Sequence, residues 1–148
     1  MTARASASPM EKTFVDSNVL IYSRDNTDGR KQRVAQRVLE ELWTQGTGTL
    51  SIQVLQEFYS TVTRKLKPPV PKEYAREVVE DYLLWCGQTT TDEVKAAFRI
   101  EDESRINFWD ALIVACARRN GATRILSEDM NSGQSIAGIL IVNPFSTP

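Results

Sequence analysis

Short apolar runs alternate along the chain with longer segments that are apolar on one face only. The short apolar runs are Thr13–Val15, Arg124–Leu126 and Ile139–Val142. A further candidate for a short strand is Thr49–Ser51. Continuous apolar runs of this length, separated by helices, are typical of parallel strands that are covered on both faces. The pattern predicts an α/β domain with a central parallel sheet of about four or five short strands and helices on both faces.

The segments between the strands carry apolar residues at helical spacing. The helices predicted in this way are a short piece at Val19–Tyr22 and longer ones at Arg30–Gln45, Ser51–Leu66, Tyr74–Cys86, Thr90–Phe98 and Phe108–Asn120. Ser51 suits the cap of its helix, and Thr90 with Glu93 forms a capping box. The helix from Phe108 is apolar on nearly every side, which predicts that it is buried.

A chain of 148 residues is long enough for one domain and forms a core without a disulfide or metal. Residues 1–11 are mostly small and polar, so we expect a flexible tail there and one domain over residues 12–148. No apolar run suits a signal peptide or a membrane span. Cys86 and Cys116 fall in predicted helices and are expected to be free thiols, which is typical of a cytoplasmic protein.

Charge and composition narrow the possible chemistry. The 18 Lys and Arg residues nearly balance the 19 Asp and Glu residues, so no overall charge points to nucleic acid or membrane. The sequence has no histidine. This excludes Ser-His-Asp and Cys-His triads, imidazole zinc sites and RNA cleavage by a histidine pair. Any catalysis must use carboxylates, hydroxyls, Lys, Tyr or metal ions.

Four acidic residues map to the carboxyl edge of the predicted sheet, where open α/β sheets bind their ligands. Asp16 ends the first strand, Glu57 lies in the helix after the second, Asp110 opens the buried helix and Asp129 follows Leu126. Carboxylates at one rim repel each other by about 4 kcal/mol per close pair. A proton, a basic partner or a divalent metal removes that repulsion, and oxygen ligands suit Mg²⁺ or Mn²⁺.

Each acid also has a purely structural interpretation. Asp16 suits a turn at a strand end, and Asp110 suits the dipole in the first turn of its helix. Glu57 lies away from the centre of its apolar helix face, as a solvated surface charge does. Glu128 competes with Asp129 for the fourth position. It is the coincidence of all of them at one edge that favours a functional site.

The segments that carry these acids resemble motifs of PIN-domain ribonucleases. The matching segments are Phe14–Tyr22 for the opening motif, Leu55–Tyr59 for the second-acid helix, Phe108–Ile113 for the third-acid helix, and Leu126–Met130 with Ile141–Phe145 for the ending seen in VapC-type toxins. The resemblance covers nearly everything from Thr13 to Phe145.

This resemblance implies a metal-dependent endoribonuclease, a hydrolase that cleaves RNA with metal-activated water and is commonly the toxin of a type II toxin–antitoxin pair. Its cofactor would be Mg²⁺ or Mn²⁺, and its products would carry a 5′-phosphate and a 3′-hydroxyl. It further implies a homodimer and a small antitoxin partner. The catalytic and metal-binding residues carried over are Asp16, Glu57, Asp110 and Asp129, with Asn18 and Ser127 in support.

Contacts with RNA are less sharply marked in the sequence. The basic residues chosen as RNA contacts are Arg24, Arg64 and Lys65, although Arg64 and Lys65 also suit the end of a helix, where cations favour the dipole. The tryptophans stand at helical spacings among apolar residues, so Trp43, Trp85 and Trp109 are expected in the core or in a dimer contact rather than as base-stacking platforms.

Two other functions remain open at this stage. One is a catalytically inactive PIN-like protein that serves as an RNA-binding module or scaffold, against which the complete set of acids argues. The other is a phosphotransfer domain, either a receiver or an aspartyl-phosphatase. That class needs a second acid beside the first-strand aspartate or a lysine after a late strand. Ser17 and Asn18 follow Asp16 instead, and no lysine follows Lys95.

Overall fold

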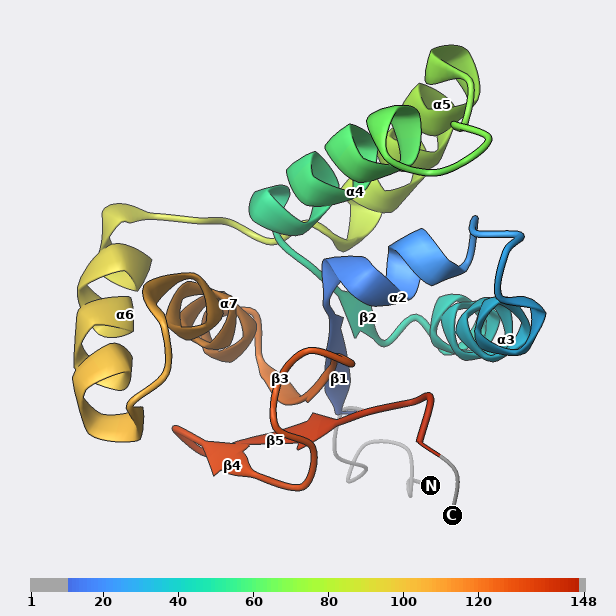
Figure 1. Ribbon diagram of the computed structural model, residues 1–148. Helices are drawn as coiled ribbons and strands as arrows, with labels where there is room; N and C mark the ends of the chain where they lie inside the picture. The colour runs from blue at the N-terminus through green and yellow to red at the C-terminus, as the bar shows by residue number, and fades with distance from the viewer. Residues whose placement is uncertain (1–10, 147–148) are drawn as a thin grey trace, which may run out of the picture.

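A five-stranded sheet forms the centre of the protein, seen in a computed structural model that describes residues 11–146 (Figure 1). Its strands are β1 (Lys12–Val15), β2 (Gly48–Thr49), β3 (Ala122–Leu126), β4 (Ser135–Ile136) and β5 (Ile139–Val142). They lie in the order β2-β1-β3-β5-β4. All neighbours are parallel except β4, which pairs antiparallel with β5. The predicted parallel α/β sheet is confirmed, with one unpredicted antiparallel edge strand.

The helices connect the strands and cover both faces of the sheet. They are α2 (Ser17–Tyr22), α3 (Gly29–Gln45), α4 (Ile52–Arg64), α5 (Lys72–Tyr82), α6 (Thr91–Ser104) and α7 (Phe108–Arg119). In Figure 1, α6 and α7 lie to one side of the strands and α3 to the other. Within residues 11–146, no helix is long and apolar enough to cross a membrane. The predicted tail, apart from Glu11, lies outside the described residues.

Side-chain caps begin the helices where the sequence predicts them. Ser51 accepts from the Val54 backbone at the start of α4, and the capping box of Thr90 and Glu93 begins α6. Asn107 caps α7. These caps satisfy backbone N–H groups that have no partner inside the helix, so they fix where each helix starts.

The strand register brings two chain segments together at the carboxyl end of the sheet. Val15 of β1 is paired with Leu126 of β3, so the next residues, Asp16 and Ser127, leave the sheet side by side. The backbone N–H of Asp16 donates to the Leu126 carbonyl at 3.0 Å. The pairing of β1 with β3 therefore sets the position of the first acidic residue.

The prediction of a helix through Cys86 is wrong at its end. Helix α5 ends at Tyr82, and one 3₁₀ turn, η1 (Leu83–Trp85), leads into extended backbone at Cys86. The Trp85 carbonyl accepts from the backbone N–H of Leu50 at 3.0 Å, and Leu50 forms a bridge with Cys86. These hydrogen bonds extend the sheet beyond β2 and override the helical pattern.

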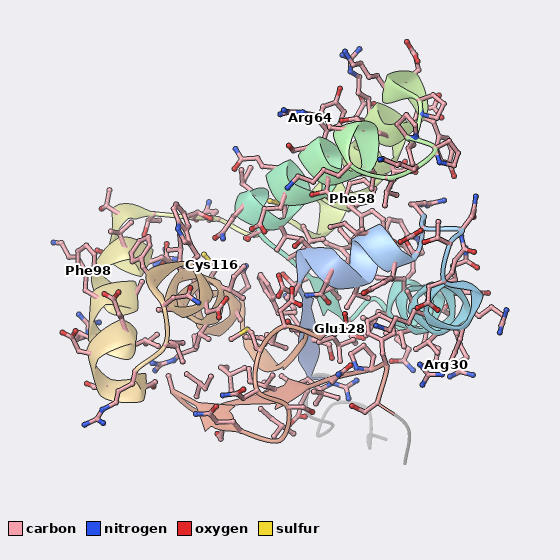
Figure 2. The ribbon with its side chains drawn as sticks, in the orientation of Figure 1. Arg30, Phe58, Arg64, Phe98, Cys116 and Glu128 are labelled. Atoms are coloured by element: carbon pink, nitrogen blue, oxygen red, sulfur yellow. The ribbon has the colours of Figure 1, made fainter. Side chains whose placement is uncertain are left out.

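The core lies between the sheet and the helices. Its fully buried residues include Phe14, Ile125 and Ile141 of the strands and Val114 of α7. The middle of helix α7, from Ala111 to Ala117, is buried as predicted, apart from the half-buried Leu112. Its Cys116, labelled in Figure 2, is a buried free thiol.

We expect Val114→Ala to lower the free energy of unfolding by about 2 kcal/mol, because it removes buried methyl groups and leaves a cavity. Val94 of α6 is the matched control, since its side chain is 38% exposed and the same substitution there should change stability by less than about 0.5 kcal/mol. Urea unfolding followed by circular dichroism measures both. Equal losses for the two variants would contradict the central placement of α7.

Candidate active site

A cleft of about 480 Å³ opens at the carboxyl end of β1 and β3. The residues that line it are Asp16, Ser17, Gln53, Gln56, Glu57, Trp109, Asp110, Ile113 and Asp129. The four acids predicted from the sequence thus share one cleft, although they come from α2's cap, α4, α7 and the loop after β3. A larger hollow of about 750 Å³ lies near Lys12 and Gly48, at the amino ends of β1 and β2, and no carboxylate lines it.

Asp16 is held by hydroxyl and amide donors. It caps α2, and its Oδ1 accepts from the Ser17 backbone at 2.8 Å. Its Oδ2 accepts from the Ser127 hydroxyl at 2.7 Å and lies 3.3 Å from Asn18 Nδ2. The residue is only 8% exposed. Its orientation is therefore fixed without a basic side chain.

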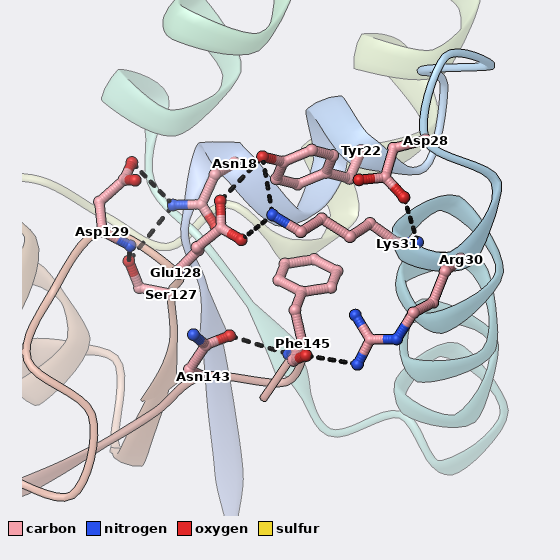
Figure 3. A network of polar contacts seen from close by, with 10 residues as sticks. All are labelled: Asn18, Tyr22, Asp28, Arg30, Lys31, Ser127, Glu128, Asp129, Asn143 and Phe145. Atoms are coloured by element: carbon pink, nitrogen blue, oxygen red, sulfur yellow. Dashed lines mark hydrogen bonds and ion pairs between the residues drawn. The ribbon is translucent and has the colours of Figure 1, made fainter. Parts of the chain in front are cut away.

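Asn18 connects the first acid to the loop after β3. Its Nδ2 lies 3.3 Å from the Ser127 hydroxyl and 3.2 Å from Asp129 Oδ2, as Figure 3 shows. Its Oδ1 accepts from the Glu128 backbone at 3.0 Å. The predicted supporting residues, Asn18 and Ser127, are thus both in contact with two of the predicted acids.

Glu128 and Asp129 point to different surroundings (Figure 3). Glu128 accepts from the Tyr22 hydroxyl at 2.8 Å and forms an ion pair with Lys31 of α3. The hydrogen bond to Glu128 raises the pKa of Lys31. Asp129 lines the cleft and Glu128 does not. The geometry therefore favours Asp129 as the fourth acid of the cleft.

The two helix-borne acids are oriented by neighbours on their own or adjacent elements. Glu57 accepts from the Ser17 hydroxyl at 3.4 Å and from Gln53 Nε2 at 3.0 Å. Asp110 accepts from Asn107 Nδ2 at 3.0 Å while its backbone donates to Asn107 Oδ1 at 2.9 Å. The cap that begins α7 thus also positions its acid.

Negative charge in the cleft is not balanced by basic side chains. The pKa of Asp16 is raised from 3.8 to about 6, mainly by burial. Its hydrogen bonds to Ser127 and Ser17 lower this pKa, and the charges of Glu57 and Asp129 raise it further. Burial and the charge of Asp129 also raise the pKa of Asp110. Among residues 11–146 the ion pairs are Lys31–Glu128 and Arg119–Glu93, and neither includes an acid of the cleft.

The donor set fits a hard divalent cation. In the described part of the chain, no three acidic, histidine or cysteine side chains already stand in a metal-binding arrangement. Each acid instead faces a hydroxyl or amide donor, while Gln53 Oε1 is buried without a hydrogen-bond partner. Oxygen ligands around uncompensated carboxylates suit Mg²⁺ or Mn²⁺. The residues that would hold such an ion are Asp16, Glu57, Asp110 and Asp129.

The basic residues predicted to contact RNA do not line the cleft. Arg24 follows α2, and its guanidinium lies 5.3 Å from the ring centre of Tyr74 and donates to the Tyr74 hydroxyl. Arg64 ends α4 and Lys65 is its C-cap, as the helix-dipole interpretation expects, and both are exposed. The structure does not bring these residues to the acids.

Two features of the cleft wall were missed from the sequence. Trp85 lies in the core as expected, whereas Trp109 is 63% exposed and lines the cleft, so it lies outside the core. The alternative expected for it, a dimer contact, stays a prediction. Its position next to Asp110 was the available signal. Gln53 was not singled out, although it stands one helical turn before Glu57 on the same face.

The metal-free protein should lose stability as the pH rises through about 6. The folded-state pKa of Asp16 lies above the unfolded value, so its stabilising contribution is complete below pH 3.8 and is lost through about 6. This loss amounts to about 3 kcal/mol. Asp16→Asn should therefore be more stable than the wild type at pH 7.5 by about 1–3 kcal/mol, and the gain should vanish near pH 4.

Urea unfolding of both proteins across this pH range checks the expectation. Millimolar Mg²⁺ at pH 7.5 should raise the Tm of the wild type more than that of Asp16→Asn, because only the wild type carries the buried charge. A stability difference that is the same at all pH values would contradict the raised pKa.

Solved structures similar to this one include those of toxins and of toxin–antitoxin complexes. A toxin–antitoxin complex from Klebsiella pneumoniae is 17% identical with a TM-score of 0.67, and the match covers 90% of this chain and 98% of that chain. DNA-bound VapBC from Salmonella typhimurium is 19% identical with a TM-score of 0.60, covering 89% and 97%. VapC20 of Mycobacterium tuberculosis, a sarcin-ricin loop cleaving toxin, is 21% identical with a TM-score of 0.59, covering 80% and 90%.

At these identities the likeness establishes the fold. A comparison with curated protein sequences gives no match. The family model described as the PIN domain matches residues 13–132, which include the segments that carry all four acids of the cleft. The match spans most of the sequence, and the chain therefore belongs to the PIN-domain family.

Proposed function

We propose that this protein is a Mg²⁺- or Mn²⁺-dependent endoribonuclease and the toxin of a type II toxin–antitoxin pair. The observation that carries the proposal is the cleft, where carboxylates from separate elements meet and no basic side chain of residues 11–146 is paired to them. Membership of the PIN-domain family and the likeness of the fold to toxin structures support the assignment.

The residues around the acids prepare the site for hydrolysis of a phosphodiester. Asn18 and Ser127 orient Asp16 and Asp129, and Asn107 orients Asp110. A bound divalent ion supplies Lewis acidity toward the phosphate and lowers the pKa of water. Because water rather than the ribose 2′-hydroxyl attacks, the products carry a 5′-phosphate and a 3′-hydroxyl. No histidine is needed for this chemistry.

No observation favours the alternatives. An inactive scaffold has no need to retain a buried carboxylate that costs stability, as Asp16 does here. The phosphotransfer domains need a lysine or a second acid beside Asp16. The residues that line the cleft include no lysine, and Ser17 follows Asp16.

The proposal includes partners and a cellular location. Its substrate is RNA in the cytoplasm, and its antitoxin covers the acidic cleft. Structures of VapBC and of another toxin–antitoxin complex are among those similar to this one. We also propose a homodimer, for which the exposed apolar side chains of Trp43, Leu83 and Leu84 offer a contact surface.

Purified protein free of antitoxin should cut total cellular RNA into discrete fragments with 5′-phosphate ends when Mg²⁺ or Mn²⁺ is present. EDTA should abolish the cleavage. Asp16→Asn and Asp110→Asn should each lower the rate by at least about 100-fold, because they remove a ligand rather than an outer partner. Fragment mapping by sequencing and rates from gel assays measure these effects.

Asp102→Asn is the matched control, since Asp102 is an exposed acid of α6 outside the cleft and should leave the rate unchanged. Cleavage that survives both EDTA and Asp16→Asn would contradict the proposal. So would intact RNA with folded, metal-loaded wild-type protein.

Asp129→Asn and Glu128→Gln should separate the two adjacent acids. Asp129→Asn should lower the cleavage rate by at least about tenfold and leave stability nearly unchanged. Glu128→Gln removes the charge that pairs with Lys31, a partly exposed pair, so it should cost up to about 1 kcal/mol of stability and little activity. A larger rate loss for folded Glu128→Gln than for Asp129→Asn would assign the fourth acid to Glu128.

A further inference from the structure

Trp109 combines high exposure with a place in the candidate active site. The residue is 63% exposed, yet it forms part of the cleft wall directly beside Asp110. A large aromatic side chain left open to water costs the free protein the stabilisation that its burial would give. Because Trp109 lies at the cleft, a ligand bound there would cover its indole.

The backbone under Trp109 is rigid and tied to the acids. Trp109, Asp110 and Ile113 lie in the first two turns of α7, and all three line the cleft. Trp109 and Ile113 are four residues apart and so lie on the same side of the helix. The cap by Asn107 holds the first turn and contacts Asp110. The backbone that carries the indole therefore belongs to the same capped turn as Asp110.

Other aromatic rings support the indole. The Phe108 ring packs on Trp109 with centroids 5.3 Å apart at an interplanar angle of 73°. Phe98 of α6, labelled in Figure 2, lies 5.7 Å from Phe108 between centroids. The resulting row of rings limits the rotamers open to Trp109. A preset flat surface of this kind loses little entropy when another ring stacks on it.

The charges of the cleft restrict how RNA can bind there. No lysine or arginine is among the lining residues, so phosphate contacts with basic side chains do not hold RNA in the cleft itself. The apolar contribution to its wall comes from Trp109 and Ile113. Nucleic-acid bases stack on exposed aromatic side chains in single-stranded segments, whereas a paired base is already stacked within its helix.

We infer that Trp109 is a stacking platform for one unpaired base next to the cleaved phosphodiester, and that it favours single-stranded positions of RNA. This inference rests on the proposed ribonuclease function. It assigns Trp109 to substrate positioning, while the acids remain responsible for the chemistry. A peptide segment of a protein partner is the other occupant that the test distinguishes.

The test uses a short single-stranded RNA that spans the main site found by mapping cleavage of total RNA. Trp109→Ala should lower kcat/KM for this RNA by about tenfold, within a range of roughly 5- to 150-fold. Trp109→Phe keeps a stacking ring and should stay within about threefold of the wild type. Leu140→Ala is the control, because Leu140 is also an exposed apolar side chain (45% exposed) but does not line the cleft.

Abasic substitution of each nucleotide beside the cleaved bond adds a second readout. At one abasic position, kcat/KM of the wild type should fall by about as much as it does in Trp109→Ala. The same abasic RNA should not lower kcat/KM of the Trp109→Ala variant further, because both changes remove the same contact. Fluorescence quenching of the Asp16→Asn protein by the uncleaved RNA, lost in the Asp16→Asn, Trp109→Ala double variant, would support the same contact.

Three results would overturn the inference. Wild-type kcat/KM in Trp109→Ala, with unchanged abasic losses, would exclude stacking while leaving the ribonuclease function intact. If that variant also failed to bind the antitoxin, the indole would be a protein-docking residue. If wild-type protein cleaved no RNA at all, the proposed function and the inference would fall together.

Discussion

The hydrogen bonds among Asp16, Asn18 and Ser127 join the carboxyl ends of β1 and β3 and fix the centre of the cleft. Pairing of Val15 with Leu126 brings the two strand ends together, and the Ser127 hydroxyl then lies 2.7 Å from Asp16. The same Asn18 amide reaches Asp129 at 3.2 Å. The register of the sheet therefore places two of the four acids, and the helices packed around it bring the other two to the same cleft.

This arrangement holds the Asp16 carboxylate out of water, and no basic side chain in the described part of the chain is paired with it. Burial raises the pKa of Asp16 to about 6, and the charges of Glu57 and Asp129 act in the same direction. A neutral side chain at this place would relieve the cost, since a buried charge without a partner is strongly unfavourable. Proteins retain such costs mainly at functional sites, where a ligand of opposite charge removes them. The electrostatics thus favour cation binding independently of family membership.

Local sequence rules were enough to predict most of the fold. Helix caps, apolar spacing and strand runs gave the parallel sheet and placed most helix ends within a few residues, although α6 continues to Ser104, beyond the predicted Phe98. The misses have physical causes outside the local sequence. Cys86 continues a helical spacing, but hydrogen bonds between Trp85 and Leu50 draw it into extended backbone at the sheet edge. The β4–β5 hairpin turns through Ala137 and Gly138, which both have positive φ, and β4 is too short to leave a pattern.

The acids of the site likewise differ in how far the local sequence could identify them. Some were identified from neighbouring residues, and others only from contacts between distant segments. Strand ends and helix starts were enough to nominate Asp16 and Asp110, but they left Glu128 and Asp129 equivalent. Their difference comes from other elements: Lys31 pairs with Glu128 and the Tyr22 hydroxyl donates to it, whereas Asp129 faces an amide and the open cleft. Two adjacent acids of the same loop thus divide into one that is paired with a lysine and one that lines the cleft. The presence or absence of a cationic partner distinguishes them, and that property exists only once the chain has folded.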